Sequence, residues 1–249
     1  MKASAKFLLI ISLIVIFSSA ARVAPLDAKS LVYQGYCSND VTQWTGGIGA
    51  LKTAYASQPE DPQIIFELIR SQYGYIGFRL AMEDEEVESD IDKALALTDV
   101  LSTKEGYASS AEAFRGALLA LKIGLKPIRA LILGPKSEKA LKRALELDRS
   151  NPVAWVEMGN MKFHAPGIFG GSNEEAIQCF TKAIALFDQN PAQKINNWQY
   201  LHSVAWLGKA YERAENFPKA IEVYKRALRI APNFLWVKKE LLPDAQKKR

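Results

Sequence analysis

The stretch that decides the fold begins at Leu201 and ends at Phe234, and it reads LHSVAWLGKAYERAENFPKAIEVYKRALRIAPNF. Its small, bulky and helix-ending residues are Leu207, Gly208, Tyr211, Ala220, Tyr224, Ala227 and Pro232. Gly208 and Ala220 allow two antiparallel helices to approach closely, while the two tyrosines fill the space between them. Pro232 ends the second helix because proline cannot continue a helix. The spacing therefore predicts a helical hairpin over 201–234.

A second unit of the same kind is predicted over 152–186, with an insertion between its two helices. Its helix-packing residues are Trp155, Met158, Gly159, Phe163, Ala176, Phe180, Ala183 and Leu186. The insertion occupies 164–171 and contains Pro166, Ile168, Phe169, Gly170 and Gly171. Ile168 and Phe169 could contact a partner or fold down as a plug between hairpins. We favour the plug because an exposed apolar pair on a loop invites aggregation.

The rest of the chain also indicates helices. We expect them at about 39–56, 61–82, 90–101, 109–124, 138–147 and 234–246. Capping boxes at 109–112 and 172–175 mark two helix starts, and Gly134-Pro135 is expected to break the chain before Ser137. The helix at 234–246 is expected to cap the stack. No strand or hairpin-turn pattern is found, so the sequence predicts an all-α protein of about ten helices in four or five hairpins.

The first residues have the pattern of a secretory signal peptide. Lys2 and Lys6 precede the apolar run FLLIISLIVIF at 7–17, and Ser18-Ser19-Ala20 supplies small residues for cleavage. The run is too short to span a membrane, and no later stretch is long enough. We predict a signal peptide over 1–20, with cleavage as late as 28 as an alternative, then a linker or ordered extension at 21–36 and a repeat domain at 37–249. A buried N-terminal helix is the competing interpretation.

The hairpin pattern of about 150–234 resembles the tetratricopeptide repeat superfamily, and that of about 60–149 resembles it less closely. The resemblance implies antiparallel hairpins stacked as a right-handed superhelix. The runs at 134–137, 169–172 and 234–238 also resemble exported bacterial tetratricopeptide proteins of unknown function. The Phe-Gly-Gly run at 169–171 loosely resembles the periplasmic T component of TRAP-associated transporters. That family implies docking of a substrate-binding protein and passage of an apolar ligand, but its members are typically lipoproteins, and no lipobox precedes Cys37.

The same resemblance implies a concave groove lined by the first helix of each unit. The residues that it assigns to the groove are Val153, Val156, Asn160, Phe163, His164, His202, Ala205, Lys209, Glu212 and Arg213. Asn160 and Lys209 stand where peptide-clamping repeat proteins hold a carboxylate, but two residues are too few to indicate a clamp, and we favour ordinary groove polarity as their explanation. We expect a protein or peptide partner in this groove. A tunnel walled by Phe, Leu and Ile would instead favour transport of an apolar ligand.

Nothing in the sequence indicates catalysis, a cofactor or a metal. The two histidines match no metal-ligand spacing, and Gly170-Gly171 lacks the lysine of a phosphate loop. The acidic run 83–86 indicates a solvated turn, because consecutive carboxylates do not space themselves around one Ca²⁺. The net charge of +5 is spread along the chain and falls to +3 without the signal peptide, which argues against nucleic-acid binding. The sequence thus predicts a non-catalytic, periplasmic scaffold.

Two cysteines, Cys37 and Cys179, would enter an oxidising compartment after export. They could pair there. However, Cys179 is expected in a helix that faces the core, whereas Cys37 is expected before the first helix. We therefore favour two free thiols over a disulfide.

Overall fold

A computed structural model describes residues 16–248, and every regular element in that range is helical. The helices are α1 (Ile16–Ser38), α2 (Val41–Ser57), α3 (Pro62–Ala81), α4 (Glu88–Ser102), α5 (Ala108–Leu125), α6 (Ala130–Leu147), α7 (Pro152–His164), α8 (Asn173–Gln189), α9 (Pro191–Lys194), α10 (Trp198–Arg213), α11 (Phe217–Ile230) and α12 (Leu242–Lys247). Short 3-10 turns occur at Glu85–Val87, Pro127–Arg129 and Gly167–Phe169, and a π-helical turn at Val237–Leu241 leads into α12. The predicted all-α class is confirmed.

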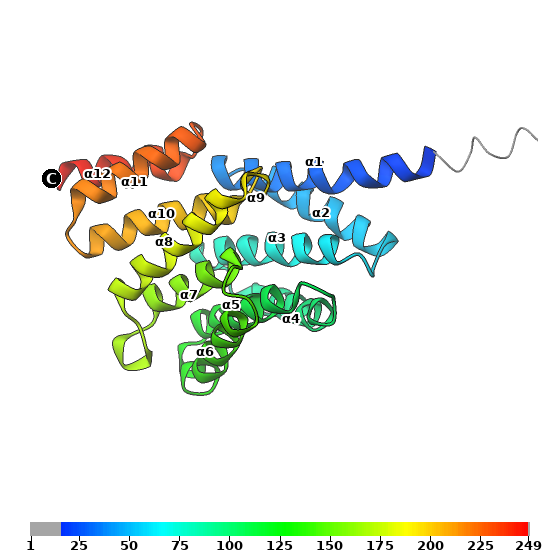
Figure 1. Cartoon of the computed structure of the whole chain (residues 1–249), viewed down its shortest axis with the longest axis horizontal. Coiled ribbons are helices and arrows are strands. Elements are labelled where there is room, and N and C mark those ends of the chain that lie inside the picture. The colour runs from blue at the N-terminus through cyan, green and yellow to red at the C-terminus, as the bar shows by residue number, and fades with distance from the viewer. Residues whose placement is uncertain (1–15, 249) are drawn as a thin grey trace, which may run out of the picture.

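The helices pair as hairpins that stack in an arc. The pairs are α1/α2, α3/α4, α5/α6, α7/α8 and α10/α11, and α12 packs on the last of them. Figure 1 shows the arc descending from α1 to α6 and rising again to α12. The first helix of each pair also packs against the first helix of the next pair. We call these five helices, α1, α3, α5, α7 and α10, the inner helices.

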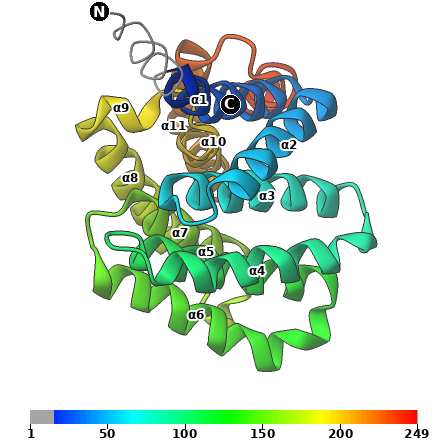
Figure 2. The same cartoon turned by 90° about the vertical axis from the view of Figure 1, so that its right-hand side faces the viewer.

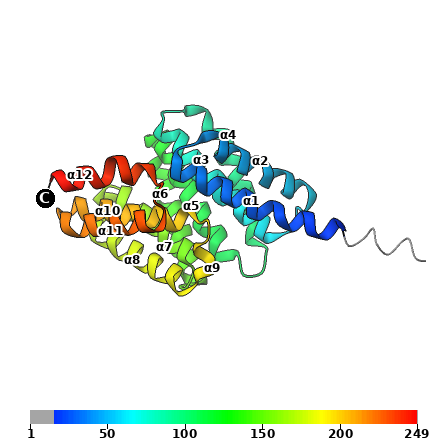
Figure 3. The same ribbon diagram turned by 90° about the horizontal axis from the view of Figure 1, so that it is seen from above.

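The arc closes on itself, because α1 contacts α10 as well as its own neighbours (Figure 2). The ring of Tyr36 lies 5.5 Å from Trp198 and 5.3 Å from Phe234, measured between centroids. Seen from above, α10 to α12 lie on one side of the stack, and α1 and α2 lie on the other (Figure 3). The closure brings side chains of the inner helices together in the centre.

Side-chain caps explain where several helices begin. Asp40, Asp61, Asn151, Ser172, Asn197 and Asn216 each accept a backbone N–H of the helix that follows. At α8 the predicted cap is present, because Ser172 Oγ accepts the Glu175 N–H at 3.3 Å. The Glu175 carboxylate does not complete the box. It pairs with Lys162 at 2.7 Å instead.

The predicted capping box at 109–112 is wrong. Ser109 lies inside α5, where its hydroxyl donates to the Ala144 carbonyl at 2.8 Å. Ser110 accepts from the Asn151 amide at 3.0 Å. Both serines are buried and therefore connect hairpins rather than cap a helix.

The predicted break at Gly134-Pro135 is also wrong, because α6 begins at Ala130 and continues through Pro135. Proline removes only one hydrogen bond there, and packing against α5 holds the helix together. Ser137 Oγ donates to the Gly116 carbonyl at 2.7 Å. A Cβ on Gly116 would meet the Leu141 side chain at 2.7 Å, so the two helices are in close contact.

The predicted linker or ordered extension at 21–36 is helical and belongs to α1. Ala28 and Val32 are buried against α2, where a Cβ on Gly47 would lie 2.7 Å from the Ala28 carbonyl oxygen. Cys37 is inside this helix, not before the first helix as expected. It and Cys179 are free and buried.

The predicted signal peptide falls mostly in 1–15, outside the described residues. Both candidate cleavage positions, after Ala20 and after Ala28, lie within α1. Within 16–248, no helix has the length and apolar character needed to span a bilayer.

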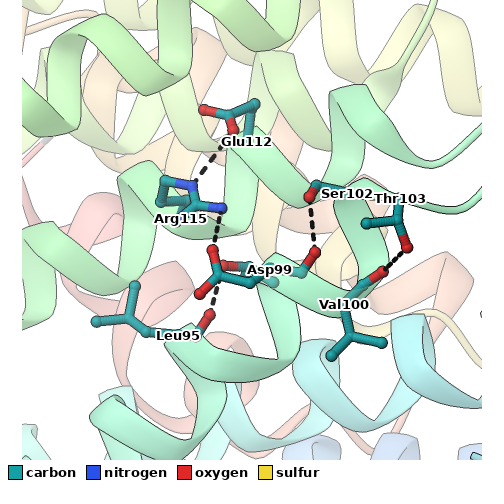
Figure 4. A network of polar contacts seen from close by, with 8 residues as sticks. Leu95, Asp99, Val100, Ser102, Thr103, Glu112 and Arg115 are labelled. Carbon is teal, nitrogen blue, oxygen red and sulfur yellow. Dashed lines mark hydrogen bonds and ion pairs between the residues drawn. The ribbon is translucent and has the colours of Figure 1, made fainter.

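An ion pair joins α4 to α5 on the outside of the stack (Figure 4). Arg115 donates to Asp99 at 2.7 Å and to Glu112, on its own helix, at 3.3 Å. Asp99 is largely exposed, so the pair adds little stability. Helix packing therefore determines the arrangement of the hairpins, and much of it is made by the second helix of one hairpin against the first helix of the next, as in α2/α3, α4/α5 and α8/α10.

Candidate functional site

A buried carboxylate occupies the centre of the closed arc. Glu157, on α7, is 2% exposed and accepts three hydrogen bonds. The donors are the Tyr73 hydroxyl of α3 at 2.6 Å, the Asn160 amide at 2.9 Å and the Gln199 amide of α10 at 2.8 Å. Each of these hydrogen bonds offsets part of the free energy that burying the Glu157 carboxylate costs.

The hydrogen bonds continue from Glu157 to α1. Asn160 Oδ1 lies 3.2 Å from His202 Nε2, and His202 Nδ1 lies 3.3 Å from the Tyr36 hydroxyl. We call Tyr36, Tyr73, Glu157, Asn160, Gln199 and His202 the central network. The central network links four of the five inner helices, α1, α3, α7 and α10. Where these helices meet, the protein's own side chains fill the concave side.

Burial shifts the pKa values of the titratable groups in the central network. Burial raises the pKa of Glu157 to about 7, although its hydrogen bonds from Tyr73, Asn160 and Gln199 act in the opposite direction. Burial, helped by nearby His164, lowers the pKa of His202 to about 3. The imidazole is therefore neutral near pH 7, and the carboxyl group is near its midpoint.

Beside the network, four aromatic side chains gather where α7, α10 and the π-helical turn meet. The Trp206 ring lies 5.0 Å from Phe163, 4.7 Å from His164 and 5.8 Å from Trp236, measured between centroids. We call Phe163, His164, Trp206 and Trp236 the aromatic rim. Phe163 is buried, the two tryptophans are half-buried and His164 is exposed. The rim thus presents aromatic surface to solvent.

Two cations lie at the rim. Arg213 stacks over the Phe163 ring at 3.5 Å from its centroid and donates to the Phe163 carbonyl at 2.5 Å. Lys209 is half-buried on the same helix. Partial burial, followed by the charges of Arg213 and Lys209, lowers the pKa of His164 to about 4. The rim is therefore positively charged near neutral pH, with His164 uncharged.

The structure divides the predicted groove residues into four sets. Asn160 and His202 belong to the central network, and Phe163, His164, Lys209 and Arg213 lie at or beside the rim. Glu212 is turned toward α11 and the C-terminal end, because it accepts the Tyr224 hydroxyl and lies 3.6 Å from Lys248 Nζ. The apolar members Val153, Val156 and Ala205 are buried in the core.

Sequence reasoning missed Tyr73, Glu157, Gln199, Trp206 and Trp236. One signal was available for Glu157, which is the only acidic residue of the mainly apolar helix α7. A lone carboxylate at an inward position predicts a buried partner. Nothing local could have indicated Tyr73, because its contact with Glu157 joins separate hairpins.

The insertion loop at 164–171 does not plug the stack. Ile168 is 86% exposed and Phe169 is 40% exposed, so the predicted plug is wrong. The loop is closed by its own backbone instead. A Cβ on Gly171 would lie 1.8 Å from the Ala165 carbonyl oxygen, and Gly170 has a φ of 83°. These two glycines allow the tight turn and leave the apolar pair pointing outward.

A hollow of about 490 Å³ lies on the outer side, between α6, α7 and α8. It is lined by Lys142, Trp155, Met158, Lys162, Glu175, Gln178, Cys179 and Lys182. It is wide open to solvent and lies away from the predicted groove residues. Within 16–248, no cluster of three or more His, Cys, Asp or Glu residues could hold a metal ion.

Comparison with known proteins agrees with this geometry. Residues 204–234 match the family model of the tetratricopeptide repeat. No curated protein matches the chain. Its fold resembles TTC0263, a thermophilic tetratricopeptide protein of Thermus thermophilus, with a TM-score of 0.59 and 15% identity over 88% of this chain and 99% of that one.

Two further solved structures have similar folds. The Cut9–Hcn1 hetero-tetramer of the APC/C matches with a TM-score of 0.56 and 16% identity over 95% of this chain, which corresponds to 40% of the matched chain. The HusA haemophore of Porphyromonas gingivalis matches with a TM-score of 0.50 and 18% identity over 75% of this chain and 93% of that one. The comparisons do not support the resemblance to the TRAP-associated T component. The chain is thus a helical-repeat protein with a tetratricopeptide-like fold, and it carries a recognisable tetratricopeptide repeat at 204–234.

Proposed function

We propose that this chain is an exported, non-catalytic scaffold that binds a protein or peptide partner on its concave side, at the aromatic rim. The observation that carries the proposal is the gathering of Phe163, His164, Trp206 and Trp236 beside Lys209 and Arg213. Half-exposed aromatic and arginine side chains are the residue types that dominate binding energy at protein interfaces.

The rim suits a partner better than the central network does. Asn160 and His202 are hydrogen-bonded to each other, and Tyr36 of α1 lies against His202. A partner that took over these groups would have to break the Asn160–His202 and His202–Tyr36 hydrogen bonds. Trp206 and Lys209 are half-buried like Asn160 and His202, but among the described residues no hydrogen bond ties their side chains to α1. A partner can therefore contact them while the central network stays intact.

The charge of the rim favours a partner segment with carboxylate groups. Arg213 and Lys209 supply positive charge, while Glu212, the nearest predicted groove acid, is engaged by Tyr224 and Lys248. Alternating aromatic and cationic groups favour an extended peptide with acidic and apolar residues. Among the fold neighbours, Cut9 is described in a hetero-tetramer with Hcn1, which is consistent with a scaffold role but does not identify a partner here.

Export is the second part of the proposal and rests on the first 20 residues alone. Cell fractionation with N-terminal sequencing tests it. A periplasmic protein that begins near Ala21 supports export, whereas a cytoplasmic protein that retains the apolar run contradicts it.

Photo-crosslinking in living cells tests the rim. The photoreactive amino acid p-benzoylphenylalanine replaces Trp206, and a control chain carries it at Lys225, which is exposed on the outer helix α11. We expect a specific protein adduct from position 206, none of the same mass from position 225, and loss of the adduct when Arg213→Glu is added. The same adduct from both positions, or one indifferent to Arg213→Glu, would overturn the proposal.

A further inference from the structure

The tip of the α5/α6 hairpin combines cations with apolar residues and has no acidic residue. Between Glu112 and Glu138 the chain contains Arg115, Lys122, Lys126, Arg129 and Lys136, and neither Asp nor Glu. The chain turns from α5 into α6 at Pro127–Arg129, at the lower edge of the stack in Figure 2. This stretch contributed nothing to the rim or to the central network.

Three bulky aliphatic side chains project from this turn into solvent. Ile128 is 80% exposed, Leu131 is 69% exposed and Ile132 is 67% exposed. Their spacing of three and four residues places them on one side of the turn and of the first turn of α6. Single exposed apolar residues are ordinary, but three together at the end of one hairpin indicate a contact surface.

Cations surround the three aliphatic residues. Lys126 and Arg129 lie 3.2 Å and 2.7 Å from the Glu88 carboxylate, and they outnumber it. Lys136 is exposed, one turn beyond Ile132. Lys122, one turn earlier on α5, pairs with Asp92 of α4 at 2.5 Å. The cations Lys122, Lys126, Arg129 and Lys136 outnumber Glu88 and Asp92, so the tip is net positive with both of these α4 acids counted.

We infer that this hairpin tip, which we call the basic tip, docks the protein on a lipid bilayer that contains anionic lipids. The geometry suits a bilayer because the aliphatic residues protrude, and a soft apolar layer can receive protruding side chains without a matching cavity. Ile128, Leu131 and Ile132 would enter the boundary between headgroups and acyl chains. Lys126 and Lys136 have side chains long enough to remain among the anionic headgroups. This inference is independent of the partner proposed for the rim.

A probe placed at the basic tip tests the inference in the full chain. Ile132→Cys is labelled with the environment-sensitive fluorophore NBD, and Ile195→Cys serves as the control, because Ile195 is 62% exposed in the loop before α10. Cys37 and Cys179 are buried, and labelling of the unsubstituted chain measures their background. A local probe is needed because the apolar run at 7–17 could itself bind lipid.

The vesicles contain phosphatidylcholine alone or mixed with phosphatidylglycerol. We expect a blue-shifted emission that rises about twofold or more at position 132 on the anionic vesicles, with no change at position 195. Lys136→Glu should weaken this response by roughly tenfold in lipid concentration, and added salt should weaken it further, whereas Lys225→Glu should not.

Three outcomes would overturn the inference. The first is an unchanged emission at position 132 on anionic vesicles. The second is an equal response on neutral vesicles, which would show that anionic lipid plays no part. The third is a response that needs no vesicles and grows with protein concentration, which would identify a second copy of the chain as the occupant.

Discussion

The hydroxyl of Tyr73 donates to Glu157 Oε2 at 2.6 Å, although the two residues belong to different hairpins and stand 84 positions apart. The bond joins α3 to α7 across the centre of the arc, and Gln199 extends it to α10. A charged carboxylate would be expensive at such a site, so the raised pKa of Glu157 is the physical cost of placing it there. The cost has a consequence for stability that depends on pH.

We expect Glu157→Gln to stabilise the protein above pH 7 and to have little effect near pH 5. The folded-state pKa of Glu157 is about 7, above its ordinary value of 4.5, so its favourable contribution is complete below pH 4.5 and is lost as the pH rises through 7. The loss is on the order of 3 kcal/mol. The glutamine can be accommodated because Gln199 Oε1 has no partner and can accept its amide after a flip. Urea unfolding at pH 5 and pH 8 measures the difference.

The matched control is Glu174→Gln, on the exposed first turn of α8. Its unfolding free energy, relative to the unsubstituted chain, should change by less than about 0.5 kcal/mol between the two pH values. A Glu157→Gln variant with the same stability difference at pH 5 and pH 8 would show that the carboxyl group titrates normally.

We expect the imidazole of His202 to stay neutral down to about pH 4. Burial lowers its pKa to about 3, so the stability it contributes is present above the ordinary pKa of 6.5 and is lost as the pH falls toward 3. Imidazole ¹⁵N shifts recorded from pH 7 to pH 4 report the protonation state directly. The variant His202→Gln identifies the His202 signals, because they disappear from its spectrum. A titration midpoint near pH 6.5 for His202 would contradict its burial in the central network.

The sequence predicted the hairpins from α3 onward, but neither helix α1 nor the closure of the arc. Small residues such as Gly208 and local caps such as Ser172 depend on neighbours in sequence, so their pattern identifies helices and hairpin contacts. The contact of Tyr36 with His202 joins residues 166 positions apart and depends on the accumulated twist of five hairpins, which no local spacing encodes. Pro135 was misread for a related reason, because packing against α5 outweighs the local preference of proline.

The candidate site could also be predicted only in part: the sequence places some of its residues on the inner helices, but not the contacts made by distant segments of the chain. A resemblance to known repeats places Asn160, Lys209 and Arg213 on inner helices, and the structure puts them there. It cannot tell that α1 closes the arc and places Tyr36 against His202. Trp236 was out of reach, because it approaches Trp206 from the chain segment after α11.

We expect Ile168→Asp to leave the stability of the protein unchanged within about 0.5 kcal/mol. The side chain is 86% exposed and loses no packing on substitution. Ile184→Asp provides the contrast, since Ile184 is 4% exposed in the core and an aspartate there should cost more than about 3 kcal/mol. The thermal unfolding midpoints of the two variants distinguish the exposed position 168 from the buried position 184. A large loss from Ile168→Asp would restore the plug interpretation of the insertion loop.

We expect Gly208→Ala to destabilise the protein by about 1–3 kcal/mol, because a Cβ at this position would lie 2.3 Å from Tyr224 Cε1. The tyrosine cannot easily move aside, since its ring is fully buried and its hydroxyl is bonded to Glu212. Gly46→Ala is the control on α2, where an added Cβ meets nothing within 4 Å and should stabilise the helix by about 0.5–1 kcal/mol. Urea unfolding measures the change in unfolding free energy that each substitution causes. The two changes should have opposite signs if the close contact between α10 and α11 requires glycine. Two stabilised variants would show that it does not.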